Sequence, residues 1–370
     1  MSQCRSVTYG TASLDVCRTY FLRSASFTIC WLYTILAVAM EVHESDRLNI
    51  SEMRWSDLFS KFIIPIEDST ESLEKMALMV FRSNDTWRIG SDKVCTVTLK
   101  NVISSVRKQY NGNKYHSFAH ACHVLLNCAK ILEDITNGRP YLTKVESLAL
   151  LFAALIHDIG HLGVSNDWLI NENHSLAILY SDQSVAEMHS LACAFEILND
   201  ADHDICAGFS KEERRTFRAV VIDLVLSTNI SDKDRQKALK QKLDTVMMSK
   251  TADGYPDMSA STSRQSILNL VIRAADVGAS MQDVETSRIW SKRFFLEQRD
   301  AVNTSGEPTV DAAEYCTQHG RFLEHHAAVL ALSLTSTGAL SQSLSADIMD
   351  STRSNVVAWH KEGSLTMKSW

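Results

Sequence analysis

Apolar residues recur along most of this chain at helical spacing, whereas runs that alternate apolar and polar residues are few. The segment 146–156 is apolar nearly all round, which predicts a helix buried in a helical core. The segment 185–198 carries apolar residues at positions i, i+3, i+7 and i+10, and 267–275 repeats this pattern just ahead of Gly278. The pattern therefore predicts an all-α fold.

Loop signals separate these helices. We expect loops at 199–212, at 249–266 and at 301–311, where the periodic pattern fades. The 370 residues contain only 13 glycines and 4 prolines. This low content of helix-breaking residues fits a chain of many packed helices.

The length of the chain favours one large domain with an extension over two equal domains. We predict an N-terminal extension at 1–80, a main domain at 81–335 and a Ser/Thr-rich tail at 336–370. The tail is weakly patterned, so we expect part of it to be disordered.

Composition and charge narrow the classes of function. The chain is 45% hydrophobic and 22% charged, as in ordinary soluble globular proteins, and its formal net charge is −7. An acidic balance argues against a general nucleic-acid-binding surface. Any phosphate group must therefore bind at a local site, not on a broad basic surface. The nine cysteines include no CxxC pair and indicate reduced thiols in an intracellular protein.

A candidate divalent-metal site begins at the end of the apolar segment 146–156. His157 and Asp158 are adjacent there, and both cost desolvation energy on burial unless a cation compensates. His161 follows four residues after His157, which places it on nearly the same helical face. Imidazole and carboxylate groups are common metal ligands.

Three further residues extend this candidate site. His116 and His120 lie four residues apart, a spacing that places both on one face of a helix. Asp276 follows the apolar segment 267–275. Each residue alone is more often an incidental histidine or a solvated carboxylate. Together, on helices able to converge, they predict metal-assisted hydrolysis.

The stretches that contain these residues resemble the signature segments of class I 3′,5′-cyclic nucleotide phosphodiesterases: Tyr115 to Val124, Ala154 to Asn166, and Ala275 with Asp276. Leu176 to His189 and Leu226 to Thr228 resemble the blocks between them in that family. The likeness runs in order from about residue 85 to residue 330. It implies a compact multi-helix catalytic domain with an HD-type, two-metal site at the bottom of a pocket.

The resemblance assigns the tighter ion, zinc in this family, to four ligands: His120, His157, Asp158 and Asp276. Asp158 also bridges to a second ion, Mg²⁺ or Mn²⁺, most of whose ligands are waters. The family pattern implies that three residues order these waters: His161, Glu187 and Thr228. Imidazole suits zinc, whereas a mainly aqueous oxygen shell suits magnesium.

The same resemblance implies hydrolysis of cAMP, with cGMP as a second candidate substrate, to the 5′-monophosphate. A hydroxide that bridges the two ions is expected to attack phosphorus while the ions neutralise the developing charge. The departing 3′ oxygen needs a proton. His116, which is not a metal ligand in the family, is the expected general acid.

Base recognition is expected in the C-terminal third. The segment 317–322 resembles the family segment whose glutamine hydrogen-bonds the purine and whose phenylalanine stacks on it, here Gln318 and Phe322. Phe322 lies one position later than the usual aromatic residue. Phe294 is the candidate for the opposite wall of the base slot, and Tyr115 for a further substrate contact. The alternative role of these aromatic residues is ordinary core packing.

Several positions depart from the family pattern: Ser117 replaces an asparagine, His123 and Asn229 stand where aspartate is common, and Gly278-Ala279 replaces Ser-Asn. None of these changes removes an expected metal ligand or the expected acid. They leave the base preference and the rate of turnover open.

Two rival functions stay open. One is a relative that binds cyclic nucleotide with weak or no cleavage, and the other is an HD-type phosphohydrolase that acts on another nucleotide. The segment around Gln318 favours the cyclic nucleotide. A purely structural helical protein would leave the buried histidines and aspartates without a role. A homodimer is a further open prediction.

The segment 24–40 contains 17 residues without a charge, preceded by Arg23 and followed by Glu41. A membrane span needs roughly 17–25 residues, so a membrane anchor and a packed helix are both compatible with it. Insertion with Arg23 on the cytoplasmic side would carry the rest of the chain away from an intracellular nucleotide. We therefore favour a cytoplasmic protein, with membrane association as the alternative.

Overall fold

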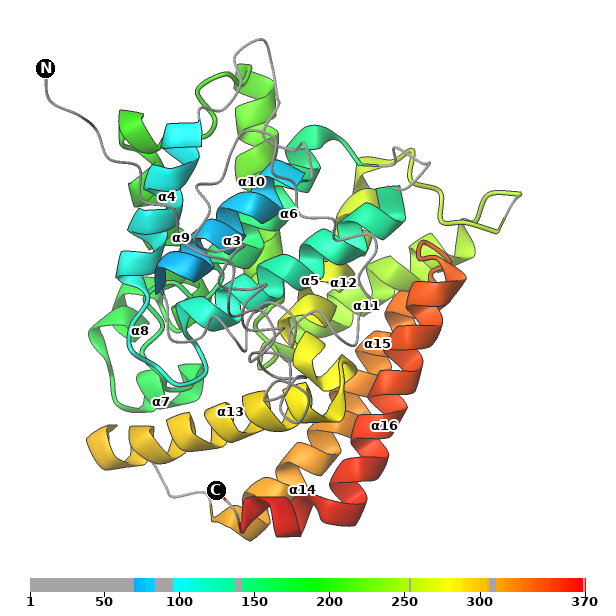
Figure 1. Ribbon diagram of the computed structural model, residues 1–370. Helices are drawn as coiled ribbons and strands as arrows, with labels where there is room; N and C mark the ends of the chain where they lie inside the picture. Colours follow the sequence, from blue (N-terminus) through cyan, green and yellow to red (C-terminus); the bar gives the residue numbers. More distant parts are fainter. Residues whose placement is uncertain (1–69, 84–95, 137–141, 253, 306–310, 369) are drawn as a thin grey trace, which may run out of the picture. The chain divides into compact units, whose positions relative to one another are not determined.

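The computed structural model describes residues 70–83, 96–136, 142–252, 254–305, 311–368 and 370. Its α-helices are α3 (Thr70–Ser83), α4 (Thr96–Gln109), α5 (Phe118–Thr136), α6 (Lys144–Ile156), α7 (Asn166–Asn171), α8 (Ser175–Tyr180), α9 (Val185–Leu198), α10 (Lys211–Ser227), α11 (Lys233–Met248), α12 (Ser261–Asp276), α13 (Val284–Ser305), α14 (Ala312–Phe322), α15 (Ala328–Ser336) and α16 (Gln342–Met367) (Figure 1). Short helical segments are η4 (Ala201–His203), η5 (Gly278–Met281) and the π-helical η6 (Leu323–Ala327). The described residues contain no strand beyond one isolated bridge, Lys250 with Pro256, so the all-α prediction is confirmed.

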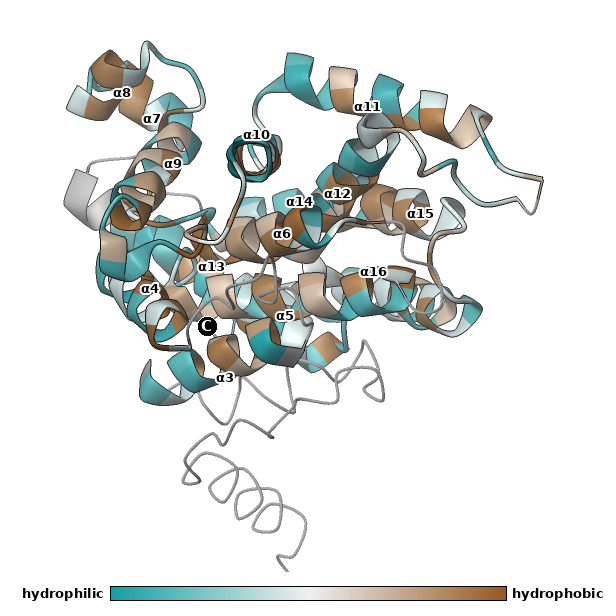
Figure 2. Ribbon diagram, turned by 90° about the horizontal axis from the view of Figure 1, so that it is seen from above, coloured by the Kyte–Doolittle hydropathy of each residue, from teal (hydrophilic) through white to brown (hydrophobic). Residues whose placement is uncertain are grey.

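Helix α6 forms the centre of the core. Every residue after Lys144 in this helix is buried, and α5 and α10 pack against it. A capping box starts the helix, in which Thr143 and Glu146 satisfy each other's backbone N–H groups. Figure 2 shows hydrophobic residues along α6 and α12, whereas α11 alternates between hydrophobic and hydrophilic residues. The buried helix predicted at 146–156 is confirmed.

Two other predicted helices are present, and two predicted loops are shorter than expected. In the loop expected at 301–311, residues 301–305 belong to α13. Helix α9 coincides with 185–198, and α12 contains 267–275. The loop expected at 249–266 ends earlier, because α12 already begins at Ser261. Arg264 in the first turns of α12 forms an ion pair with the buried Glu146 of α6. This tertiary contact stabilises a helical turn that the Ser/Thr-rich sequence does not predict.

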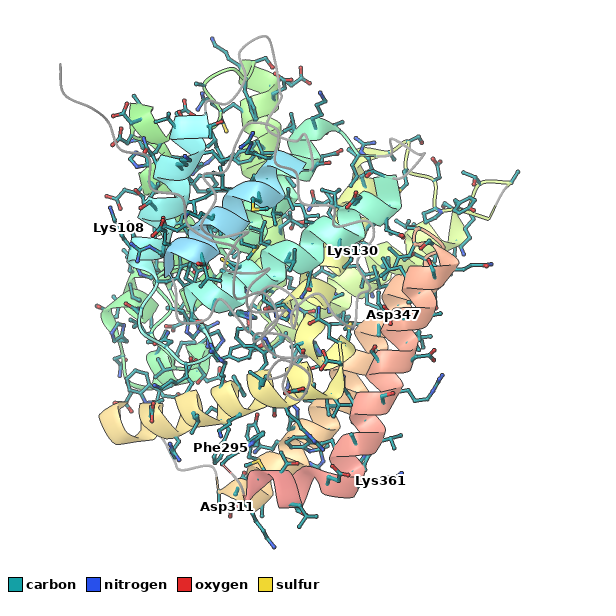
Figure 3. All side chains as sticks on the ribbon, viewed as in Figure 1. Lys108, Lys130, Phe295, Asp311, Asp347 and Lys361 are labelled. Carbon is teal, nitrogen blue, oxygen red and sulfur yellow. The ribbon has the colours of Figure 1, made fainter. Side chains whose placement is uncertain are left out.

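The chain's last residues form helix α16, and the expectation of partial disorder there is wrong. Leu344, Ile348 and Trp359 are buried on one side of α16, which packs against α14 and α15. Trp359 belongs to the same apolar cluster as Phe295, whose side chain lies between α13 and α14 in Figure 3. Frequent serine and threonine residues in α16 obscure the helical spacing of these buried apolar residues in the sequence.

The segment 24–40 lies outside the described residues, as does the rest of 1–69. Helix α3 runs across the predicted boundary at residue 80 and packs against α5. Among the helices that the structure describes, none is long and apolar enough to cross a membrane. The boundaries at residues 80 and 335 stay predictions.

Candidate metal and nucleotide site

A cavity of about 500 Å³ lies where the end of α12 meets the segments before α5 and after α6. It is lined by ten of the residues expected from the sequence: Tyr115, His116, Asp158, His161, Glu187, Thr228, Asp276, Phe294, Gln318 and Phe322. The other two expected residues, His120 and His157, are 1% and 2% exposed. His120 contacts the carboxylate of Asp276, and His157 contacts that of Asp158; both carboxylates line the cavity. A cavity of this size suits a small ligand.

Three segments far apart in sequence converge at one wall of this cavity. Nε2 of His120 lies 3.0 Å from Oδ1 of Asp276. Nε2 of His157 lies 3.1 Å from Oδ2 of Asp158 and 3.3 Å from Oδ1 of Asp276. Ligand atoms of His120, His157 and Asp158 all lie within 4.8 Å of one another. The structure thus brings together the four residues expected to hold the tighter ion.

The environment of His157 fits a metal ligand. Its Nδ1–H donates to the carbonyl oxygen of Ala154, at 3.0 Å, which directs Nε2 toward the carboxylates of Asp158 and Asp276. Nε2 is buried and has no hydrogen-bond partner, although two carboxylates face it. Buried polar atoms are rarely left unpaired, and backbone hydrogen bonding from the far nitrogen is typical of ligating histidines. The donor set therefore suits a divalent cation.

The charges of this cluster perturb one another strongly. Burial lowers the pKa of His157, but the neighbouring Asp158 and Asp276 raise it well above its usual value. Burial likewise raises the pKa of both aspartates, yet the histidines hold these values well below the usual range. Two carboxylates therefore stay ionised at the cavity wall, where a dication would be strongly attracted.

His116 lies in a bend ahead of α5, so the prediction that it shares a helical face with His120 is wrong. The cause is Glu297 on α13. One carboxylate oxygen of Glu297 accepts the backbone N–H groups of Tyr115 (2.6 Å) and His116 (3.0 Å), and the other bonds Nδ1 of His116. This clamp holds the backbone ahead of the helix and directs the His116 ring into the cavity.

The same clamp charges His116. Burial alone lowers the pKa of this ring, but the buried carboxylate of Glu297, aided by Asp158, raises the pKa of His116 to about 9. At neutral pH the ring is therefore an imidazolium that faces the cavity. No sequence pattern pointed to Glu297, because 181 residues separate it from His116.

His161 does not continue the helix of His157. Helix α6 ends at Ile156, and Gly160 has φ +75°, a left-handed conformation that turns the chain away. The His161 ring stacks on His116 instead, with ring centroids 3.8 Å apart at 22°. Burial, with the positive charge of His116, lowers the pKa of His161 to about 3, so this ring is neutral.

Glu187 and Thr228 reach the cavity from α9 and from the end of α10. Asn166 donates to a carboxylate oxygen of Glu187 at 3.0 Å, and burial raises the pKa of Glu187. The Thr228 hydroxyl donates to the carbonyl oxygen of Val225, at 2.8 Å. Both residues line the cavity.

Aromatic residues also line the cavity. Phe294 on α13 packs edge-on against Tyr115, with ring centroids 5.1 Å apart. Phe322 is the last residue of α14, directly before the π-helical segment η6. Gln318 is one turn earlier, and its Nε2 donates to Glu314 at 3.0 Å. The candidates for base recognition thus line one cavity together with the metal cluster.

An all-helical fold with a His/Asp cluster at the wall of a small-molecule cavity is compatible with a metal-dependent hydrolase that has an HD-type site. The family model described as 3′5′-cyclic nucleotide phosphodiesterase matches residues 115–321, which is more than half of the chain. The chain belongs to this family. Every expected site residue except Phe322 lies within the matched part.

Individual relatives agree with this assignment. The chain is 34% identical over 208 residues to the probable 3′,5′-cyclic-AMP phosphodiesterase pde-4 of Caenorhabditis elegans, covering 54% of this chain and 29% of the relative. It is 32% identical over 249 residues to the 3′,5′-cyclic-AMP phosphodiesterase 4C of Rattus norvegicus, covering 65% of this chain and 44% of the relative. The chain thus spans less than half the length of these relatives.

A solved structure shows the same fold. The phosphodiesterase domain of the RhoPDE fusion protein from the choanoflagellate Salpingoeca rosetta superposes with a TM-score of 0.73 at 24% sequence identity. The match covers 87% of this chain and 96% of that domain.

Proposed function

We propose that this chain hydrolyses the 3′,5′-cyclic phosphate of cAMP to the 5′-monophosphate. The observation that carries the proposal is the convergence of His120, His157, Asp158 and Asp276 beside a charged His116 on one cavity. The relatives named as cyclic-AMP phosphodiesterases support cAMP as the substrate. We include cGMP as a second substrate, because the amide of Gln318 can offer both a donor and an acceptor.

Two divalent ions belong to this proposal. The four converging residues would hold zinc, and Asp158, with waters ordered by Glu187, would contribute to a site for Mg²⁺ or Mn²⁺. When bound, such ions polarise the phosphate and supply a nucleophile at neutral pH. The unpaired Nε2 of His157 and the ionised aspartates support the fit.

His116 is proposed as the acid that protonates the departing 3′ oxygen. It reaches the cavity, its Nδ1 is bound to Glu297, and its other nitrogen is left for the substrate. Stacking on the neutral His161 fixes the ring plane. Orientation and charge of this acid are thus both provided by the chain itself.

The base is proposed to bind between Phe294 and Phe322, with its edge toward Gln318. All three line the cavity. Stacking between aromatic rings and a single amide contact would orient the purine without making the pocket selective for one base.

The decisive experiment is hydrolysis of cAMP and cGMP at several concentrations, with and without chelator, alongside linear nucleotides. We expect 5′-AMP from cAMP, loss of activity with chelator and recovery with added Zn²⁺ and Mg²⁺. Tight binding of cAMP without 5′-AMP would favour the non-cleaving relative. Cleavage of linear nucleotides alone would favour the HD-type phosphohydrolase.

The cytoplasmic location, the homodimer and the alternative of membrane association through 24–40 remain parts of this proposal. Fractionation of the full chain and its molecular mass in solution test them. Recovery in the membrane fraction after a high-salt wash would favour the anchor.

A further inference from the structure

Behind the metal cluster, buried polar side chains form a continuous series of hydrogen bonds that ends next to Asp276. Asn127 of α5 donates from Nδ2 to the carbonyl oxygen of Ala275, at 3.0 Å. Gln282 donates from Nε2 to Oδ1 of Asn127, at 2.9 Å. Oε1 of Gln282 lies 2.9 Å from Nε2 of His123. His123, Asn127 and Gln282 are all 0% exposed, so water does not compete for these bonds.

The backbone carbonyl of Ala275 sets the direction of every bond in this series. A carbonyl only accepts, so Asn127 turns its NH₂ group toward Ala275 and its oxygen toward Gln282. Gln282 then presents its NH₂ group to Asn127 and its oxygen to His123, which must donate from Nε2. Flipping either amide would place oxygen against oxygen in a buried site, so this arrangement pairs both amides. Nδ2 of Asn127 also lies 3.3 Å from Nε2 of His123.

The ring of His123 suits its position at the end of this series of hydrogen bonds. The ring can donate from Nε2, whereas an ionised carboxylate could not donate to the oxygen of Gln282. The His123 ring also stacks on Trp290, with centroids 5.3 Å apart at 6°, which fixes the direction of its N–H group. His123 and Gln282 therefore function as a pair.

The series is anchored at its far end to the C-terminal helix. Asn355 of α16 donates from Nδ2 to the carbonyl oxygens of Ser280, at 3.0 Å, and Gln282, at 2.7 Å. Asn355 is 2% exposed. Through Asn355, α16 is bonded to the segment η5, which follows Asp276. This segment places Gln282 next to Asn127.

We propose that His123, Asn127 and Gln282 are positioning residues for the metal ligand Asp276. They fix the carbonyl of the residue before it, and with it the direction in which the Asp276 carboxylate faces His120 and His157. The inference rests on the metal site proposed above. Because no ligand is removed when this series is broken, the expected defect is looser metal binding with all four ligands still present.

The test is metal affinity in Asn127→Leu and Gln282→Met, which keep side-chain size but cannot form these hydrogen bonds. We expect about 10- to 100-fold weaker zinc binding than in the unaltered full chain, measured by competition with a chromophoric chelator. The visible spectrum of the Co²⁺-loaded protein should change as well. The double variant should lose little more than the weaker-binding single variant, since both break one series.

A matched control separates positioning from general stability. Asn269 lies on α12, the helix that ends at Asp276, and is 2% exposed. It donates to Asp223 at 2.8 Å and takes no part in this series of hydrogen bonds. Asn269→Leu should lower the thermal midpoint yet leave zinc affinity and the Co²⁺ spectrum unchanged. If Asn127→Leu does not fold, Gln282→Met carries the same test.

The outcomes distinguish the two proposals. Unaltered zinc affinity in a folded Asn127→Leu or Gln282→Met variant overturns the positioning role and leaves the metal site intact. Equal weakening of zinc binding by Asn269→Leu also overturns the positioning role. If the unaltered chain binds neither Zn²⁺ nor Co²⁺, the proposed metal site itself is wrong.

Discussion

His116 shows how a single side chain acquires a function from its contacts. In the sequence it is one of 13 histidines. In the structure, Glu297 binds its Nδ1, His161 stacks on its ring and the other edge faces the cavity. These contacts give it charge and orientation, the two properties that a general acid needs.

Replacement of His116 by alanine should therefore separate catalysis from metal binding. We expect kcat for cAMP to fall by about 10²- to 10⁴-fold, the usual contribution of a positioned acid, with zinc content unchanged. Turnover and metal analysis of the same preparation check this. His325→Ala, at a side chain that is 77% exposed, serves as the control and should leave both unchanged. Loss of zinc in His116→Ala would contradict the assignment.

Glu297→Gln tests the charge of this acid. Burial lowers the pKa of His116, and Glu297 raises it to about 9. A histidine donates a proton only while protonated, so activity should fall as pH rises through this value. In the variant, the alkaline limb of the kcat–pH profile should move down toward pH 6.5 or below. An unmoved limb would show that another group supplies the proton.

The same pair has a consequence for stability. A raised histidine pKa stabilises the folded state fully below the unfolded value of 6.5, and this contribution is lost as pH rises through about 9. Glu297→Gln should thus lose more stability, relative to the unaltered chain, at pH 6 than at pH 10. Denaturant unfolding at both pH values provides the measurement.

At the scale of elements, the ends of helices place the functional groups. His157 caps α6, Asp276 ends α12 and Thr228 caps α10. These ends meet at one cavity because the apolar bodies of α6, α10 and α12 pack on one another. Sequence periodicity predicted the bodies of α6, α9 and α12 correctly, since each carries its own buried residues.

The ends themselves were harder to predict. Local spacing predicts helix from His157 to His161, although Gly160 turns the chain. It also predicts His116 on the helix of His120, although Glu297 holds His116 in a bend. In both places the conformation depends on a partner or a positive φ that local periodicity does not encode. The weakly patterned α16 was missed because its buried side is set by α14 and α15.

Gly160→Ala tests the turn that carries His157 and Asp158. The new Cβ would lie 2.9 Å from Nε2 of His189, and φ +75° is unfavourable for alanine. We expect a loss of about 1–3 kcal/mol in the free energy of unfolding, measured with urea. Gly112→Ala is the matched control, because its Cβ meets nothing within 4 Å. Equal stability of the two variants would contradict the strained turn.

At the scale of the molecule, the His/Asp cluster connects α5, the turn after α6, and α12. A cation bound there should stabilise the folded state, because the unfolded chain holds these ligands far apart. We expect the thermal midpoint to fall with chelator and to rise with free zinc. At a zinc concentration 100 times the dissociation constant, the free energy of unfolding should rise by about 2.7 kcal/mol. Asp276→Asn should flatten this dependence, and a midpoint insensitive to zinc in the unaltered chain would contradict the site.

The sequence by itself determined the helical class, the bodies of the main helices and the residue types of the candidate site, because periodicity and the pairing of histidine with aspartate are local properties. Only the tertiary structure decided that Glu297 binds His116, that His161 stacks on His116 and that Asn127 donates to the carbonyl oxygen of Ala275. Each of these contacts joins residues more than forty positions apart. Such contacts arise from packing, which brings distant helices together at low exposure to water.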